Sequence, residues 1–294
     1  MPFLPNRISL FIGLLGLSLA SCGQNKITME LIHTLKHEKP VLIVAFSPDG
    51  KFIASGSGDK DIEVWELESG EMVRTLAGHA DWVGSLAYSP DGRYIVSGSG
   101  DKTVGIWDAK SGALLRAIPG FDVLIGAVAY SPDGKFVAAA LYDNTIKIWD
   151  VSNGLLVQTL TGHSEFVRTV AYSPDGKSIA SGSRDRTIKI WEVSSGRVLQ
   201  TLTGHDHFVL SVAYSPDGRY GEMSSVTYLP NGKYLAACLY DGSIEVIETS
   251  TFTVAYTLAA HAEWAISVAC SPDGKYLASG SGDSTVKVWR FRDH

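Results

Sequence analysis

The sequence predicts an all-β protein built from a repeated unit of four antiparallel strands. Three features indicate this fold class. Tryptophans recur at strictly equal intervals, the turn phrase Ser-Pro-Asp-Gly precedes each of them, and short runs of alternating apolar residues lie between the turns. The recurring tryptophans are Trp65, Trp107, Trp149 and Trp191. With 294 residues, 45% of them hydrophobic and 19% charged, the chain is long enough to bury a sizeable core.

One period, from residue 162 to residue 192, shows the order of its elements. An apolar run ending at Tyr172 is expected to be the first strand, and it leads into the turn 173–176. The proline of this turn presets φ, and its glycine accepts the positive φ that a tight hairpin needs. A strand of small residues follows at 179–183, and a second turn precedes the alternating residues 188–192. A four-stranded sheet of this kind cannot bury both faces alone, so we expect the units to stack around a ring.

This repeat resembles the WD-repeat family. The resemblance rests on Gly-His before the first strand, Ser-Pro-Asp-Gly after it, an Asp in the second turn and a Trp in the third strand, all at fixed offsets. It extends over residues 27–294 and implies that this part of the chain is a single WD-repeat β-propeller of four-stranded antiparallel blades.

The resemblance also implies a buried network in each complete repeat, which links the His before the first strand, a Ser in the second, the turn Asp and the Trp. The residues carried over are His37, Ser55, Asp59 and Trp65; His79, Ser97, Asp101 and Trp107; His163, Ser181, Asp185 and Trp191; and His261, Ser279, Asp283 and Trp289. A hydrolase triad is the alternative interpretation of Ser, His and Asp. We favour a structural role, because the set recurs and an indole and an imidazole need buried partners.

Two repeats depart from this pattern. Around Asp143 the expected His is Phe121 and the expected Ser is Ala139. Around Asp241 the Ser is Ala237 and the Trp is Ile247. The network is therefore not expected in these two blades.

The number of strands is irregular. Ile247 holds the tryptophan offset of its repeat, yet it follows Trp191 by only one and one third periods where two are needed. Two thirds of a period is therefore absent, and the break lies near Tyr220. We predict six complete blades plus one extra first strand, provided that residues 30–35 supply the outer strand of the last blade. Seven blades with one incomplete is the alternative. Either arrangement leaves a strand edge at risk of being unpaired.

The first residues differ from the rest. Residues 1–21 have signal-peptide anatomy, with an arginine before an uncharged stretch that is too short to span a bilayer. The sequence ending in Cys22 resembles the lipobox of bacterial lipoproteins, which implies a lipidated Cys22 and a short tether over 22–26. An ordinary secretory signal is the alternative. The predicted location is the bacterial cell envelope, with the lipid in a membrane outside the cytoplasm, and Gly23 favours the outer membrane.

Composition and motifs argue against several functions. The net charge of −6 supplies no basic field for a phosphate backbone, so no nucleic-acid partner is predicted. The sequence contains no His-Glu-x-x-His, nucleophile elbow, Walker loop or paired-cysteine zinc pattern, and we predict no catalytic, metal or cofactor residues. We expect Cys238 and Cys270 to be free thiols rather than a disulfide.

The predicted function is a non-catalytic scaffold that binds a protein or peptide. In the family, ligands often dock on the face that bears the start of the first strands and the residue before each turn Asp, here called the top face. The predicted partner-binding residues at these offsets are Trp82, Leu124, Tyr142, Phe166, Arg168, Arg184, Phe208, Tyr240 and Trp264. Aromatic and arginine residues are typical of interface cores.

Three other interpretations remain open. The large top-face side chains could simply cover neighbouring loops. A propeller hydrolase or lyase could work at the mouth of the central channel. A carbohydrate or cell-wall binding module could stack sugar rings on Trp82 and Trp264.

Overall fold

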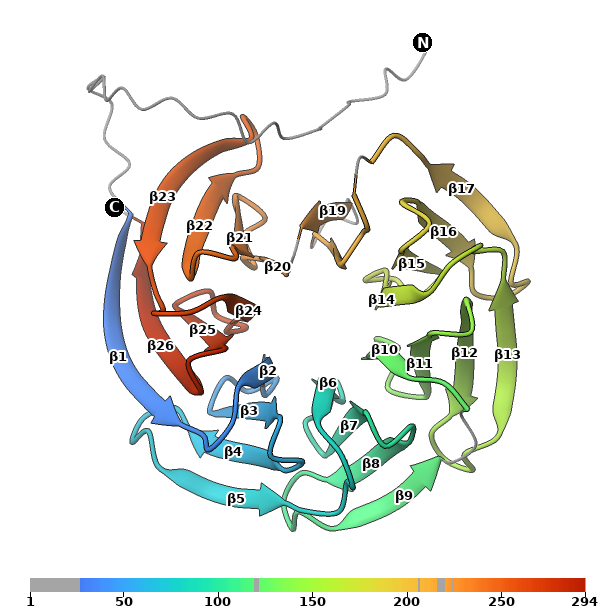
Figure 1. The fold of residues 1–294 in the computed structure, drawn as a ribbon, viewed down its shortest axis with the longest axis horizontal. Coiled ribbons are helices and arrows are strands. Elements are labelled where there is room, and N and C mark those ends of the chain that lie inside the picture. The colour runs from blue at the N-terminus through green and yellow to red at the C-terminus, as the bar shows by residue number, and fades with distance from the viewer. Residues whose placement is uncertain (1–26, 119–121, 206, 216–219, 224, 294) are drawn as a thin grey trace.

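The computed structural model describes residues 27–118, 122–205, 207–215, 220–223 and 225–293. All regular elements in these ranges are β-strands, arranged in a ring (Figure 1). No helix in the described part of the chain is long and apolar enough to cross a membrane. The leader 1–21, the tether 22–26 with Cys22, and Phe121 lie outside the described residues, so the expectations for them stay predictions.

The first three blades follow one another without interruption. Blade 1 consists of β2 (Val41–Phe46), β3 (Phe52–Ser57), β4 (Ile62–Glu66) and β5 (Met72–Leu76). Blade 2 consists of β6 (Val83–Tyr88), β7 (Tyr94–Ser99), β8 (Val104–Asp108) and β9 (Leu114–Ile118). Blade 3 consists of β10 (Ile125–Tyr130), β11 (Phe136–Leu141), β12 (Thr145–Asp150) and β13 (Leu156–Thr161).

The second half of the ring holds three further blades and one smaller sheet. Blade 4 consists of β14 (Val167–Tyr172), β15 (Ser178–Ser183), β16 (Ile188–Glu192) and β17 (Val198–Leu202). The short sheet consists of β18 (Ser211–Tyr214) and β19 (Tyr220–Met223). Blade 5 consists of β20 (Val226–Tyr228), β21 (Tyr234–Cys238), β22 (Ser243–Glu248) and β23 (Thr253–Ala259). Blade 6 consists of β24 (Ala265–Cys270), β25 (Tyr276–Ser281), β26 (Thr285–Arg292) and β1 (Thr28–Lys36).

The ring closes through its first strand. β1 pairs antiparallel with β26, from Thr28 opposite Arg292 to Lys36 opposite Thr285. A segment at the start of the described chain thus becomes the outer strand of the last blade, which ties the two ends together. The prediction of six complete four-stranded antiparallel blades is confirmed.

The extra first strand is β18. It pairs antiparallel with β19, with Ser211 opposite Met223 and Tyr214 opposite Tyr220. The short sheet stands in the ring between blades 4 and 5 (Figure 1). The sequence predicted β18 but not β19, because β19 lacks the run of small residues that marks the second strand of the complete blades.

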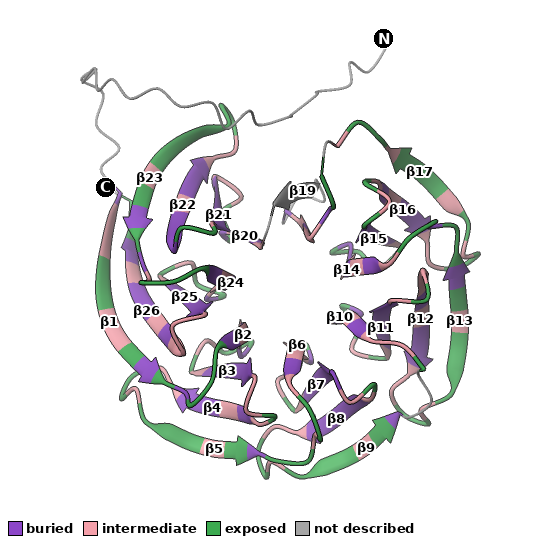
Figure 2. Ribbon diagram, viewed as in Figure 1, coloured by how far each residue is buried: buried purple, intermediate pink, exposed green. Residues whose placement is uncertain are grey.

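The core lies between neighbouring blades. Inner strands are mostly buried and outer strands such as β5, β9 and β13 are mostly exposed (Figure 2). The second strands carry small residues because the next blade packs tightly on them. A Cβ on Gly56 would lie only 2.7 Å from Cγ1 of Val83 in the following blade.

The Ser-Pro-Asp-Gly turns have the expected chemistry. In blade 4, Ser173 Oγ donates to Asp175 Oδ1 at 2.7 Å, and the amide of Gly176 donates to the Ser173 carbonyl at 2.9 Å. Gly176 has a φ of +69°, which glycine adopts at little steric cost. Each turn therefore fixes the register of the first two strands of its blade.

Candidate functional site

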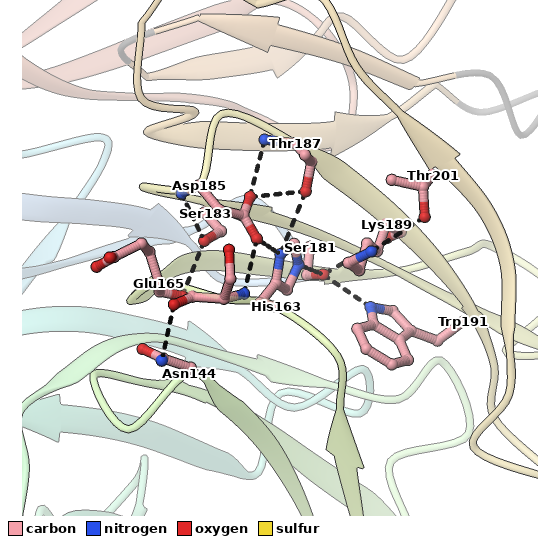
Figure 3. A network of polar contacts seen from close by, with 11 residues as sticks. Asn144, His163, Glu165, Ser181, Ser183, Asp185, Thr187, Lys189, Trp191 and Thr201 are labelled. Carbon is pink, nitrogen blue, oxygen red and sulfur yellow. Dashed lines mark hydrogen bonds and ion pairs between the residues drawn. The ribbon is translucent and has the colours of Figure 1, made fainter.

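The buried network of blade 4 is complete (Figure 3). Trp191 Nε1 donates to Ser181 Oγ at 2.7 Å. Ser181 Oγ lies 2.8 Å from His163 Nε2, and His163 Nδ1 lies 2.7 Å from Asp185 Oδ2. Four side chains from two turns and two strands are thus joined in one line of hydrogen bonds.

The indole of Trp191 and the carboxylate of Asp185, at the two ends of this chain of hydrogen bonds, determine which groups donate. The Trp191 indole can only donate, so Ser181 Oγ accepts from it and donates to His163 Nε2, which leaves the Nδ1 proton for Asp185. Burial lowers the pKa of His163. Burial acts to raise the pKa of Asp185, but hydrogen bonds from Thr187 and His163 outweigh it and hold that pKa below its usual range. A neutral imidazole and a charged carboxylate follow.

The same geometry recurs in blades 1, 2 and 6. The distances from His Nε2 to Ser Oγ are 2.8 Å for His37 and Ser55, 2.7 Å for His79 and Ser97, and 2.8 Å for His261 and Ser279. The indoles of Trp65, Trp107 and Trp289 donate to the same hydroxyls at 2.9, 2.7 and 3.4 Å, and the Asp contacts are Asp59 at 3.3 Å, Asp101 at 2.8 Å and Asp283 at 3.0 Å.

These serines are poorly suited to nucleophilic catalysis. Ser55, Ser97, Ser181 and Ser279 are fully buried, and each hydroxyl already accepts from an indole. A nucleophile must reach its substrate and lose its proton to the base. The arrangement instead links the second and third strands of a blade to the loop before its first strand.

Blades 3 and 5 lack the network for the expected reason. Ala139 and Ala237 stand fully buried where other blades have the serine, and Ile247 replaces the indole. Cys238, at the end of β21, is a free buried thiol, and Cys270 is free and partly buried.

Blade 1 has an additional carboxylate at Glu63. Its Oε2 lies 3.2 Å from His37 Nε2, the nitrogen that also contacts Ser55. Burial, and then the neighbouring carboxylates, raise the pKa of Glu63 to about 7. Because burial also lowers the pKa of His37, the imidazole is neutral, and this contact is not an ion pair at neutral pH. Sequence reasoning missed this residue. At the same offset, blades 2, 3, 4 and 6 have a glycine or a lysine, and blade 5 has a second glutamate, Glu245.

Among the described residues, one group has the composition of a metal site. The ligand atoms of His37, Asp59 and Glu63 lie within 4.8 Å of one another. Both nitrogens of His37 are already hydrogen bonded, to Ser55 and Asp59. A metal ion would have to break the network that holds blade 1, so we assign the group a structural role.

The top-face positions are paired by the backbone. In blades 1, 2, 3, 4 and 6, the residue before the turn Asp donates its backbone amide to the carbonyl of the residue that precedes the first strand of the same blade. These bonds join Gly100 to Trp82 (2.9 Å), Tyr142 to Leu124 (3.0 Å), Arg184 to Phe166 (2.9 Å) and Gly282 to Trp264 (3.1 Å). In these blades, two residues from different loops therefore lie side by side at the start of the first strand.

Five of the predicted residues form one continuous stack, here called the arginine–aromatic cluster: Tyr142, Phe166, Arg168, Arg184 and Phe208. The rings of Tyr142 and Phe166 are stacked, with centroids 4.9 Å apart and 12° between planes. Arg168 lies over Tyr142 at 5.4 Å, and Arg184 lies over both Phe166 and Phe208 at 5.3 Å. The cluster joins blades 3 and 4 to the segment before β18.

The two guanidinium groups carry the charge of this cluster. Burial, and then the charge of Arg184, lower the pKa of Arg168, whereas Tyr240 acts in the opposite direction. The Nε of Arg168 is buried without a hydrogen-bond partner among the described residues. Neither arginine forms an ion pair with a described carboxylate. Two cations thus face the top surface with no described carboxylate to neutralise them.

The other predicted top-face residues lie outside this stack. Trp82 is half-buried on its own blade, where a Cβ on Gly84 or Gly100 would collide with its indole. Leu124 is half-buried, whereas Tyr240 and Trp264 are 68% and 57% exposed. Trp82 therefore packs over Gly84 and Gly100 of its own blade, whereas Trp264 is open to solvent.

A tyrosine-lined depression of about 400 Å³ lies at the opposite end of the inner strands. Tyr88, Tyr130, Tyr172 and Tyr214 line it, and each ends a first strand. Burial raises the pKa of Tyr88, Tyr130 and Tyr172, so these phenols are neutral. No carboxylate or imidazole is among the residues that line it. Sequence reasoning missed this ring, although the equal spacing of the tyrosines could have indicated it.

Comparison with known families gives one match that covers most of the chain. The model described as "WD domain, G-beta repeat" matches residues 29–66, 70–108, 112–150, 154–192, 196–221, 220–248 and 252–290. The boundary between its fifth and sixth matches coincides with the short sheet.

Individual relatives share only a few repeats with the chain. A probable serine/threonine-protein kinase PkwA of Thermomonospora curvata is 51% identical over 49 residues, which are 17% of this chain and 7% of that protein. A WD repeat, SAM and U-box domain-containing protein 1 of Danio rerio is 36% identical over 92 residues, 26% of this chain and 19% of that protein. The nuclear distribution protein PAC1 of Coprinopsis cinerea is 49% identical over 37 residues, 13% and 8% respectively. The chain covers less than a fifth of each of these proteins.

Proposed function

The chain belongs to the WD40-repeat family, and on that premise we propose that it is a protein-interaction scaffold whose top face binds a segment of another protein. The observation that supports this function is the arginine–aromatic cluster, in which Arg184 bridges Phe166 and Phe208. Arginine and large aromatic residues dominate the binding energy of many protein interfaces. Phe208 is 51% exposed, so part of this apolar surface is free to be covered.

The charge of the cluster favours an acidic partner segment. Each guanidinium stacks on a ring and keeps edge N–H groups that can donate to a carboxylate in a bidentate way. The protein carries a net charge of −6, so Arg168 and Arg184 form a local positive site on a negative molecule. A partner with carboxylates beside an apolar residue would fill both parts of the cluster.

Binding accounts for the geometry better than catalysis does. The Ser-His-Asp sets are buried structural elements, and no carboxylate or imidazole lines the tyrosine-lined depression. A hydrolase or lyase needs groups that exchange protons near neutral pH beside an accessible substrate. Carbohydrate binding would use Trp264, whose exposed indole could stack on a sugar ring.

We also propose that the scaffold acts at a bacterial cell envelope through a lipid on Cys22. Support for this comes from the sequence, with its apolar stretch ending at a cysteine. Metabolic labelling with an alkyne fatty acid should label the protein, and Cys22→Ala should abolish the label and release the protein from membranes. Equal labelling of both forms would contradict the assignment.

Affinity capture from an envelope extract tests the scaffold function. The propeller is compared with an Arg168→Gln/Arg184→Gln variant, and with Leu155→Ser as a control, because Leu155 is 66% exposed and lies outside the cluster. Both variants must keep the thermal midpoint of the parent protein. We expect mass spectrometry to find a protein retained by the parent and the control but lost by the double variant. Equal retention by all three would refute top-face binding by this cluster.

A further inference from the structure

The short sheet ends at β19, where every complete blade continues with two more strands. The two thirds of a period absent between Trp191 and Ile247 correspond to these third and fourth strands with their turns. Around this gap, the structure shows surfaces that the missing strands would cover. In the complete blades, the third and fourth strands cover the equivalent surfaces.

In complete blades, the third-strand tryptophan packs against the blade before it. Trp107 Cη2 lies 3.2 Å from the position of a Cβ on Gly78, and Trp191 Cη2 lies 3.3 Å from that of Gly162. Trp289 shares a core cluster with Ala260, which holds the same offset. Each indole thus covers the residue that follows the outer strand of the preceding blade.

Blade 4 lacks this cover. Gly204 is its residue at that offset, and a Cβ on Gly204 would have nothing within 4 Å. Leu202, at the end of β17, is only partly buried, whereas its equivalents Leu76 and Leu160 are 0% and 1% exposed. Blade 4 therefore presents a socket for an aromatic side chain that no described residue fills.

The other side of the gap differs. A tryptophan at position 247 of blade 5 would pack on the outer strand of the preceding blade, which is one of the missing strands. The chain has an isoleucine at this position. Ile247 is 4% exposed and packs in a cluster with Leu235 and Ala213. Blade 5 is closed without the missing strands, so the unfilled surface belongs to blade 4.

The backbone beside the socket also has a free edge. β19 pairs with β18 on one side, and no other described strand pairs with it. Unpaired N–H and C=O groups on an edge strand are a template for another strand. The socket continues the existing interface between blade 4 and the short sheet, where Ile188 and Ile190 pack with Val209 and Val212.

We propose that this open half-blade, formed by the edge of β19 with Leu202 and Gly204 of blade 4, binds a β-hairpin of another protein. The first strand of the hairpin pairs with β19 and places an aromatic side chain over Gly204, and its second strand takes the outer position. The site is separate from the arginine–aromatic cluster, and the proposal does not rest on the proposed top-face function.

A peptide copied from this chain can test the site. Residues 184–203 contain the third and fourth strands of blade 4, with Trp191 in the third strand, and these are the elements missing from the short sheet. Their binding to the whole protein is measured by calorimetry, and the backbone amides of Tyr220–Met223 are followed by hydrogen exchange. We expect saturable binding, slower exchange in β19, and at least about tenfold weaker binding for a peptide with Trp191→Ala.

Matched protein variants locate the site. Leu202→Lys should weaken peptide binding about tenfold, whereas Leu199→Lys, on the same strand but 49% exposed, should not change it. Both must keep the thermal midpoint of the parent. No binding, unchanged exchange in β19, or equal effects of the two lysines would overturn the proposal. A dimer of the protein that Leu202→Lys disrupts would also overturn it, because a second copy would then fill the site.

Discussion

The indole of Trp191 donates to Ser181 Oγ at 2.7 Å while its ring lies against Gly162 of the preceding blade. One side chain therefore completes the polar network inside blade 4 and fills the interface with blade 3. The ring is 1% exposed. Its removal should weaken both the blade and its contact with its neighbour.

Trp191→Ala should lower the free energy of unfolding by about 3–5 kcal/mol, because it removes a buried aromatic ring and leaves a cavity. Urea unfolding measures this change. Trp264→Ala is the matched control, since the ring is 57% exposed and the expected change is within about 0.5 kcal/mol. Equal effects of the two substitutions would refute the structural role of Trp191.

Leu160→Ala and Leu202→Ala should differ, although the two leucines hold the same place in successive repeats. Leu160 is 1% exposed under the next blade, so we expect a loss of about 2–5 kcal/mol. Leu202 is partly exposed beside the gap, and its loss should stay below about 1 kcal/mol. Equal losses in urea unfolding would mean that the socket on blade 4 is filled.

The propeller should lose stability in mild acid. Burial lowers the pKa of His37, His163 and His261 in the folded state, so the unfolded chain binds more protons as the pH falls through about 6.5. The free energy of unfolding should decrease from pH 7 to pH 5, and less steeply for His163→Gln. A stability that is constant or rises over this range would contradict neutral buried imidazoles. A second loss, from carboxylates such as Asp185, belongs below pH 4.

Glu63→Gln should stabilise the protein in alkaline but not in acidic solution. The pKa of Glu63 is raised to about 7 in the folded state, so its favourable contribution is present below pH 4.5 and is lost as the pH rises through 7. At pH 8 we expect the thermal midpoint of Glu63→Gln to lie about 2–4 °C above that of the parent, with little difference at pH 5. If Glu63→Gln raised the thermal midpoint more at pH 5 than at pH 8, the raised pKa of Glu63 in the folded state would be refuted.

Most of the fold could be predicted because the same sequence pattern recurs in successive blades. The spacing of Trp65, Trp107 and Trp191 indicated the blades, and the repeat offsets placed Phe166 and Arg184 on the same face. Closure by β1 could be predicted because residues 30–35 resemble an outer strand and lie before the first strand of blade 1. These features depend on the local sequence of each repeat and on the number of strands.

The remaining features depend on contacts between different repeats. The stacking of Tyr142 on Phe166 joins two blades, and no offset within one repeat indicates it. The pairing of β18 with β19 could not be predicted, because β19 has no run of small residues. The raised pKa of Glu63 arises first from burial and then from three other carboxylates that lie near it in the folded chain.

The most direct test of top-face binding is site-specific photo-crosslinking in cells that make the protein. A photoreactive phenylalanine analogue replaces Phe208 in the arginine–aromatic cluster, or the exposed Lys177 directly after a Ser-Pro-Asp-Gly turn at the opposite end of the inner strands. We predict a discrete cross-linked protein from position 208 that is absent from position 177 and is lost with Arg168→Gln/Arg184→Gln. No cross-link from position 208, or the same product from both positions, would contradict the account.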